Sequence, residues 1–321
     1  MGNSRRIVTV TIPSLLIACA VAATGCKGDS SKPGGGTDAA DPLNYVPAAA
    51  NLLVGVDVPK VSASPLVREV LIPTLQGSDT SRADAIQSAC LDGMKSITLG
   101  GETGDHGAMV FVANGLQESQ LPACAAAIAG VGADEVTVTR EGRVSKVSAR
   151  GQRSWVGWGA GGVAVSVNGV DDAAAVELVL SAADKRSDNS ALKDLIGDTN
   201  TGANIWFSFR NPSGSAAVEG VPYKMLSAHG TIDLSSGFVL DMVARAENAE
   251  EATKMVETVR SQLKASSSMP PFKVLYDGHR IGAKGEVVEF RMVLSQAQVE
   301  TLVPILTTMA PMMMGGARGG L

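Results

Sequence analysis

Short apolar runs separated by polar turns dominate the chain between residues 43 and 310. Several runs alternate apolar and polar residues, most clearly Val136-Thr137-Val138-Thr139, which predicts strands with one face in water. Paired runs flank turn sequences such as Glu141-Gly142, which is typical of antiparallel hairpins. The predicted strands cover residues 51–58, 94–99, 108–113, 135–140, 143–149, 154–158, 163–167, 203–210, 224–233, 237–246, 273–281 and 286–294.

Apolar residues spaced three and four apart predict helices between these strands. The strongest covers residues 249–264, where one apolar stripe is made of Ala252, Met255, Val256, Val259 and Leu263. Ser64, followed by Pro65, and Ser295 are predicted to cap the starts of two further helices. The remaining predicted helices cover residues 80–91, 117–129, 171–183 and 191–196.

Hairpins followed by a covering helix occur in both halves of the chain. This order predicts an α+β fold of two related units, residues 43–185 and 186–310, each an antiparallel sheet with helices packed on one face. The single alternation of strand and helix that builds a doubly wound parallel sheet is missing. Residues 311–321, rich in Met and Gly, are expected to form a disordered tail.

The first 25 residues have the pattern of a secretory signal peptide. Arg5 and Arg6 give a basic start, and Ile7 to Ala23 carry no charge. This apolar stretch is near the lower limit for crossing a bilayer and contains Pro13, so we interpret it as a cleaved signal. It ends in Ala23-Thr24-Gly25-Cys26, small residues directly before a cysteine.

That ending resembles the signal of bacterial lipoproteins. The resemblance implies that the Cys26 thiol receives a diacylglyceryl group, that cleavage precedes Cys26, and that its new amine is acylated with a chain such as palmitate. The alternative is an ordinary signal with an incidental cysteine beside the cut. Residues 26–42, mostly Gly, Ser, Pro and Asp, are expected to be a flexible tether, and two or more acyl chains give stable membrane attachment.

A lipoprotein of this kind is expected in the cell envelope, facing the periplasm or the cell surface. Lys27 stands where the enterobacterial sorting rule places an inner-membrane Asp, so the outer membrane is favoured. The segments YVPAAANLLVGVDV and AHGTIDLSSGFVLDMVARAENAEEATKMVETVRSQL also resemble uncharacterised exported lipoproteins of myxobacteria and related bacteria. That resemblance implies an α+β fold and transfers no active-site residues.

The charge balance argues against two classes of partner. Removal of residues 1–25 takes away Arg5 and Arg6 and no acid, which leaves 25 basic against 32 acidic residues and a net charge of −7. We therefore expect neither nucleic-acid binding nor electrostatic adhesion to anionic lipid. Aromatic residues make up only 4% of the chain, so the core must be aliphatic.

Two cysteines remain once Cys19 leaves with the signal and Cys26 is acylated. Cys90 and Cys124 form an even pair in an oxidising compartment, which predicts a disulfide; two separate buried thiols are the alternative. Neither has the spacing of a metal site, and we expect no metal and no cofactor.

Two short matches to catalytic or cofactor motifs lack the context that those motifs need. Ser190-Ala191-Leu192-Lys193 fits S-x-x-K, but Ser187-Asp188-Asn189 precedes it and no K-T-G follows, so we interpret Ser190 as a helix cap. Gly157 to Gly162 fits G-x-G-x-x-G but leads into a strand, which predicts a hairpin turn rather than a dinucleotide loop.

The histidines and tryptophans are the remaining candidates for chemistry. His106, beside Asp105, and His279 are expected in exposed loops, and none of the three histidines, which include His229, has a second ligand at metal spacing. Trp206 is expected in the core. Trp155 and Trp158 are expected to point to opposite faces of one strand, so that one of them could contact a ligand.

Three hypotheses follow. The first is a lipid-anchored, non-catalytic binding or structural module of the envelope whose partner is unknown. The second is an envelope hydrolase with a site assembled from scattered residues such as Asp105, His106 and Ser190. The third is a carrier that holds a small apolar ligand between sheet and helices.

Overall fold

A computed structural model describes residues 41–71, 84–103, 108–168, 172–184, 190–211 and 223–315, without the side chains of residues 71 and 306–315. The predicted signal peptide, Cys26, the tether up to residue 40 and residues 316–321 lie outside this description, as do Asp105 and His106.

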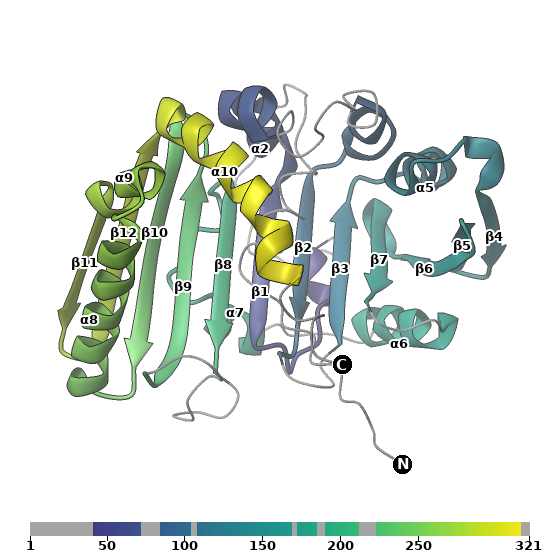
Figure 1. Cartoon of the computed structure of the whole chain (residues 1–321). Coiled ribbons are helices and arrows are strands. Elements are labelled where there is room, and N and C mark those ends of the chain that lie inside the picture. The colour runs from purple at the N-terminus through teal and green to yellow at the C-terminus, as the bar shows by residue number, and fades with distance from the viewer. Residues whose placement is uncertain are drawn as a thin grey trace, which may run out of the picture.

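The strands of the described residues form one open sheet of 12 antiparallel strands (Figure 1). Its order is β11-β12-β10-β9-β8-β1-β2-β3-β7-β6-β5-β4. The predicted mixed α+β fold is therefore confirmed. The strands are β1 (Leu52–Asp57), β2 (Ser96–Gly101), β3 (Met109–Asn114), β4 (Thr137–Glu141), β5 (Val144–Ala149), β6 (Gln152–Trp158), β7 (Val163–Val167), β8 (Ile205–Arg210), β9 (Met225–Asp233), β10 (Gly237–Ala246), β11 (His279–Lys284) and β12 (Val287–Ser295).

Helices connect these strands and cover parts of the sheet. They are α2 (Val58–Ala63), α5 (Leu121–Ala129), α6 (Ala173–Asp184), α7 (Ser190–Ile196), α8 (Ala249–Ser266), α9 (Lys273–Asp277) and α10 (Gln296–Gly315), with the short helical segments η1 (Pro42–Tyr45), η2 (Val67–Leu71), η3 (Gln87–Leu91), η4 (Glu118–Gln120), η5 (Ala133–Glu135), η6 (Ala160–Gly162) and η7 (Pro270–Phe272). The caps predicted at Ser64 and Ser295 are confirmed, because their hydroxyls accept from the backbone N–H groups of Val67 and Gln298.

The two halves of the chain meet in the middle of the sheet, where β1 pairs with β8. Val54 lies opposite Phe207, and Leu53 lies opposite Ser208. Two core clusters contain residues from both halves: Val56 shares one with Leu302, and Leu53 shares the other with Trp206. The predicted boundary near residue 185 therefore falls between α6 and α7, within one continuous sheet.

Strand register assigns each side chain to one of two faces. We call the side of Val54 and Leu240 the front face, since α8 and α10 lie in front of the sheet in Figure 1. The side of Leu53 and Trp206 is the back face, against which α6 and α7 pack.

The prediction that helices pack on one face is wrong for the first half of the sheet. On its front face, η3 and α5 pack through Cys90 and Cys124, while on its back face α6 packs through Val176 and Leu180. Strand β7 is buried on both sides as a result, and its sequence VAVSV is nearly continuous in apolar residues, as expected for a strand between two layers.

In the second half, α8, α9 and α10 pack on the front face, and only α7 packs on the back face, beside β8. Strand β12 shows the consequence: Val288, Phe290 and Leu294 are buried, whereas Glu289 and Arg291 between them are exposed. Its alternation of buried and exposed residues is typical of a sheet that is covered on one side only.

The strand predicted over residues 273–281 is wrong at its start, because Lys273–Asp277 is helical. Pro270 and Pro271 begin a helical turn directly before it, and the Lys273 ammonium bonds the Asp277 carboxylate at i,i+4 across 2.8 Å. Helix α10 continues to Gly315, beyond the point where its sequence predicts an end. Among the described helices, none has the length and apolar character needed to cross a membrane.

Candidate functional site

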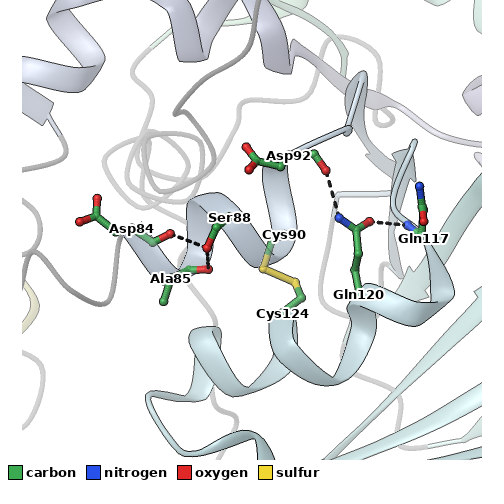
Figure 2. The surroundings of a disulfide bond; sticks show 8 residues. All are labelled: Asp84, Ala85, Ser88, Cys90, Asp92, Gln117, Gln120 and Cys124. Atoms are coloured by element: carbon green, nitrogen blue, oxygen red, sulfur yellow. Dashed lines mark hydrogen bonds between the residues drawn. A yellow bond between two sulfur atoms is a disulfide. The ribbon is translucent and has the colours of Figure 1, made fainter.

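The predicted disulfide is present and joins Cys90 of η3 to Cys124 of α5 (Figure 2). Both cysteines are buried in the cluster that fills the front face of the first half. Nearby, the side-chain amide of Gln120 donates to the Asp92 carbonyl across 3.0 Å and ties α5 to the end of η3. The two helical segments are thus held together by covalent and polar links.

The structure does not bring the remaining candidate residues into one cleft. Ser190 begins α7, consistent with its interpretation as the start of a helix. His229 lies in the middle of β9, and His279 begins β11 with its ring Nδ1 donating to the Tyr276 carbonyl. Gly157 to Gly162 form the predicted turn between β6 and β7 rather than a phosphate loop.

The tryptophans behave as the pattern predicts. Trp206 is 8% exposed and packs in the back-face cluster. Register places Trp155 and Trp158 on opposite faces of β6: Trp155 packs against the back-face cluster, with the Lys146 ammonium 5.5 Å from its ring centroid, and Trp158 contacts the front-face cluster. Both are half-buried.

A groove lies on the back face of the second half, which α8, α9 and α10 leave uncovered. This groove has a volume of about 580 Å³. Its floor is made of strands β9, β10, β12 and β11, and its wall is the turn between α7 and β8. We call it the open-face groove; its polar lining residues are Asp198, Thr199, Asn200, His229, Thr231, Asp241, Arg280, Glu289 and Arg291.

A row of polar side chains crosses the floor of the groove. Register aligns Thr231, Asp241, Arg291 and Arg280 on four successive strands. Nη1 of Arg291 donates to both carboxylate oxygens of Asp241, at 2.9 and 3.0 Å, so this pair neutralises itself.

Arg280 stands directly opposite Arg291, and within the described residues it has no ion pair. Glu289, two residues before Arg291 on β12 and on the same face, has none either. Like charges placed opposite each other across a strand pair are unfavourable. Arg280 and Glu289 are therefore opposite charges on this face that the fold leaves without an ion pair among the described residues.

The wall of the groove is held by short-range bonds. Gly202 N–H donates to the Asn200 side chain across 3.1 Å, and Ala203 N–H donates to the Asn200 carbonyl across 3.2 Å. The buried Ser208 hydroxyl donates to the Leu195 carbonyl and fixes α7 against β8. These bonds therefore hold the side of the groove next to β8 in place. The opposite side of the groove is formed by the edge strand β11.

The open-face groove presents charged groups of both signs. It offers guanidinium donors, carboxylate acceptors and the exposed apolar side chain of Val293 nearby. No group of three His, Cys, Asp or Glu side chains that could hold a metal ion occurs among the described residues. Arginine is enriched in protein-binding surfaces, whose rim is polar and accessible to solvent.

Comparison with known proteins adds no family. No family model, curated protein or solved structure matches this chain. Function must therefore be argued from the surface itself.

Of the groove residues, sequence reasoning considered only His229. Arg280, Glu289 and Arg291 sit on strands whose positions were predicted, and the alternating pattern of residues 286–294 was the available signal. The pattern does not show which strands lie next to each other. The order of the strands decides whether the polar face is covered by a helix or left open.

Proposed function

We propose that this protein is a lipid-anchored, non-catalytic component of the bacterial cell envelope that binds a partner protein in the open-face groove. The anchor rests on the sequence Ala23-Thr24-Gly25-Cys26 and on the apolar stretch before it. The disulfide between Cys90 and Cys124 supports export, because such bonds persist in oxidising compartments. The uncovered charged face of the second half is the observation that carries the binding role.

The tether suits such a role. Residues 26–42 fully extended would reach roughly 55–60 Å, and as a flexible coil their ends would lie on the order of 20–25 Å apart. The segment η1 that follows packs on the back face through Tyr45, which is 3% exposed. The chain thus enters the domain on the side of the sheet that bears the groove.

The occupant that fits the groove is a protein surface carrying both an acidic and a basic side chain. A carboxylate would meet Arg280, and a cation would meet Glu289; like Asp198, both are groove charges that have no ion pair among the described residues. Complementary charge of this kind gives specificity and register in protein recognition. The groove is lined by charges, which disfavours the carrier of an apolar ligand.

The hydrolase alternative depends on Asp105 and His106, which lie outside the described residues. The described candidates lie apart: Ser190 is on α7, which packs against β8, and three strands separate β8 from β11, where His279 lies. Recognition without catalysis is therefore the function that we favour.

The two halves of the fold support the proposal of two related units. In each half three strands follow a meander, a helix then crosses the front face, and the last strand returns to pair with the third: β1-β2-β3, α5 and β7 in one half, β8-β9-β10, α8 and β12 in the other. The antiparallel pairing of β1 with β8 would then be the junction between the units.

The binding proposal is tested by photo-crosslinking in cells that express the full chain. A photoreactive residue replaces Val243 in the groove, or Leu178, an exposed side chain of α6 outside it. We expect one crosslinked partner from position 243 and none from position 178. Arg280→Glu should abolish the crosslink, whereas Lys264→Glu, an equal charge change on α8 of the opposite face, should preserve it. Equal crosslinking in both charge variants would refute the proposed surface.

The anchor is tested separately. Cys26→Ser should abolish metabolic labelling with palmitate and release the protein from membranes. Unchanged membrane retention of Cys26→Ser would remove the anchor from the proposal and leave the binding surface unaffected.

A further inference from the structure

A second, smaller pocket lies at one end of the first half of the sheet, away from the open-face groove. Three segments converge there: residues 93–95 before β2, residues 115–118 after β3, and residues 158–162 between β6 and β7. The pocket has a volume of about 460 Å³, within the range of roughly 300–1,000 Å³ that is typical of small-molecule sites. We call it the Trp158 pocket.

Main-chain bonds hold the walls of the Trp158 pocket together. Gly115 N–H donates to the Gly162 carbonyl across 3.1 Å, and Lys95 N–H donates to the Asn114 carbonyl across 2.7 Å. Gly115 has a φ of +97°, and a Cβ there would lie 2.4 Å from the Gly93 carbonyl oxygen. Only glycine allows the two segments to approach so closely.

The indole of Trp158 is fixed in one orientation. Its Nε1 donates to the hydroxyl of Ser145, a fully buried residue, across 2.9 Å. Part of the ring packs against the front-face cluster, and part lines the pocket. Because the indole N–H is already satisfied, the ring offers the pocket an apolar aromatic surface.

The rim of the pocket carries basic, amide and acidic side chains. Lys95 and Gln117 are exposed, and neither side chain has an ion pair among the described residues. Glu118 is engaged by Arg140, so its charge is balanced within the protein. The N–H of Gln117 donates to the side chain of Gln120 across 2.8 Å, which fixes the backbone of this wall beside the disulfide (Figure 2).

We propose that the Trp158 pocket binds a neutral saccharide. A pyranose ring has an apolar face of C–H groups and a rim of hydroxyls, which matches an aromatic surface surrounded by amide, ammonium and carboxylate groups. Lys95 and Gln117 supply donors for ligand hydroxyls, and a purely apolar ligand would leave this polar rim without water or partner. The pocket is independent of the open-face groove, so this inference does not rest on the proposed protein partner.

The test uses three neutral trisaccharides as probes: cellotriose, maltotriose and the trimer of N-acetylglucosamine. Binding is measured by titration calorimetry and by tryptophan fluorescence. We expect at least one probe to bind. Trp158→Phe, which keeps an aromatic side chain for packing, should weaken that binding by about tenfold.

Two further variants keep the test decisive. Gln117→Ala alters an exposed rim residue, so it should fold normally and weaken binding by about fivefold. Trp155→Phe, on the same strand but the opposite face, should bind like the wild type. The proposal is overturned if no probe binds at concentrations up to about 10 mM, or if Trp158→Phe and Gln117→Ala both bind like the wild type.

Discussion

The two halves of the sheet are built from similar strands and differ in how they are covered. The first half has helices on both faces, with β7 buried between them, whereas in the second half α8, α9 and α10 pack on the front face and the short helix α7 covers only the part of the back face beside β8. Where helices cover both faces of the sheet, the side chains on both sides of the strands are buried and contribute to stability. Coverage on one face leaves a sheet surface available for recognition, and this is where the charges of Asp241, Glu289, Arg280 and Arg291 gather.

The comparison predicts the largest loss of stability in the doubly covered half. Leu180 of α6 is fully buried on the back face, and Leu180→Ala should lower the free energy of unfolding by about 2–5 kcal/mol through lost burial and a cavity. Leu178 of the same helix is 71% exposed, and Leu178→Ala should change it by less than about 0.5 kcal/mol. Urea unfolding measures both, and equal losses would contradict the assignment of the buried layer.

The disulfide is expected to have the next largest effect. It closes a loop with a sequence separation of 34, so Cys90→Ala together with Cys124→Ala should cost about 2–4 kcal/mol. Hydrogen exchange should accelerate in α5, β2 and β3 more than in β10 and β12. Reduction should lower the urea midpoint of the wild type and leave that of the double variant unchanged; a wild-type midpoint insensitive to reductant would contradict the bond.

Tyr45, near the start of the described residues, packs on the back face of the first half. Its hydroxyl accepts a hydrogen bond from Ala160 N–H across 2.9 Å. Tyr45→Phe should cost about 1 kcal/mol, measured by urea unfolding at pH 7. Burial raises the pKa of the Tyr45 phenol above its ordinary value of 10.0. Above pH 10 the unfolded chain loses this proton while the folded chain keeps it, so stability falls as pH rises.

The pH dependence separates Tyr45 from tyrosines elsewhere. In Tyr45→Phe, the loss of stability above pH 10 should be shallower than in the wild type. Burial also raises the pKa of Tyr223, so a residual slope should persist. A Tyr45→Phe profile as steep as that of the wild type would show that Tyr45 does not contribute to it.

The smallest effect on stability is expected in the open half. Arg291 and Asp241 form an ion pair whose side chains are 53% and 47% exposed, and such pairs contribute about 0–1 kcal/mol. Arg291→Gln should therefore leave the urea midpoint nearly unchanged while it weakens crosslinking from position 243. A large destabilisation would mean that this face is part of the structural core rather than a recognition surface.

Much of the fold follows from local pattern. The stripe of Ala252, Met255 and Val256 predicted α8, and the turn at Glu141-Gly142 predicted the hairpin of β4 and β5. These features depend on residues close in sequence, whose periodicity and turn chemistry act locally. The pair Cys90 and Cys124 was also predictable, since few cysteines remained to combine.

The order of the strands could not be predicted in this way. The pairing of Val54 with Phe207 joins residues far apart in sequence, and any apolar strand could have filled either position. The open-face groove could not be predicted for the same reason. Arg291 becomes a functional candidate only once the structure shows that the described helices leave the back face of β12 uncovered. The error at Lys273–Asp277 has a different cause: a short apolar segment fits a strand or a helix until its i,i+4 pair and the preceding prolines are weighed.

The junction of β1 with β8 has a consequence for the newly made chain. The final edge strands carry charges that discourage pairing between molecules, such as Arg140 on β4 and Lys284 on β11. Strand β1 has no such protection, because Leu52 to Val56 carry no charge. Until residues 205–209 have been synthesised, β8 cannot pair with β1, and the first half presents an apolar strand edge. A chain truncated before these residues should therefore associate with other copies of itself. In the complete fold, strand β8 of the second half covers this edge.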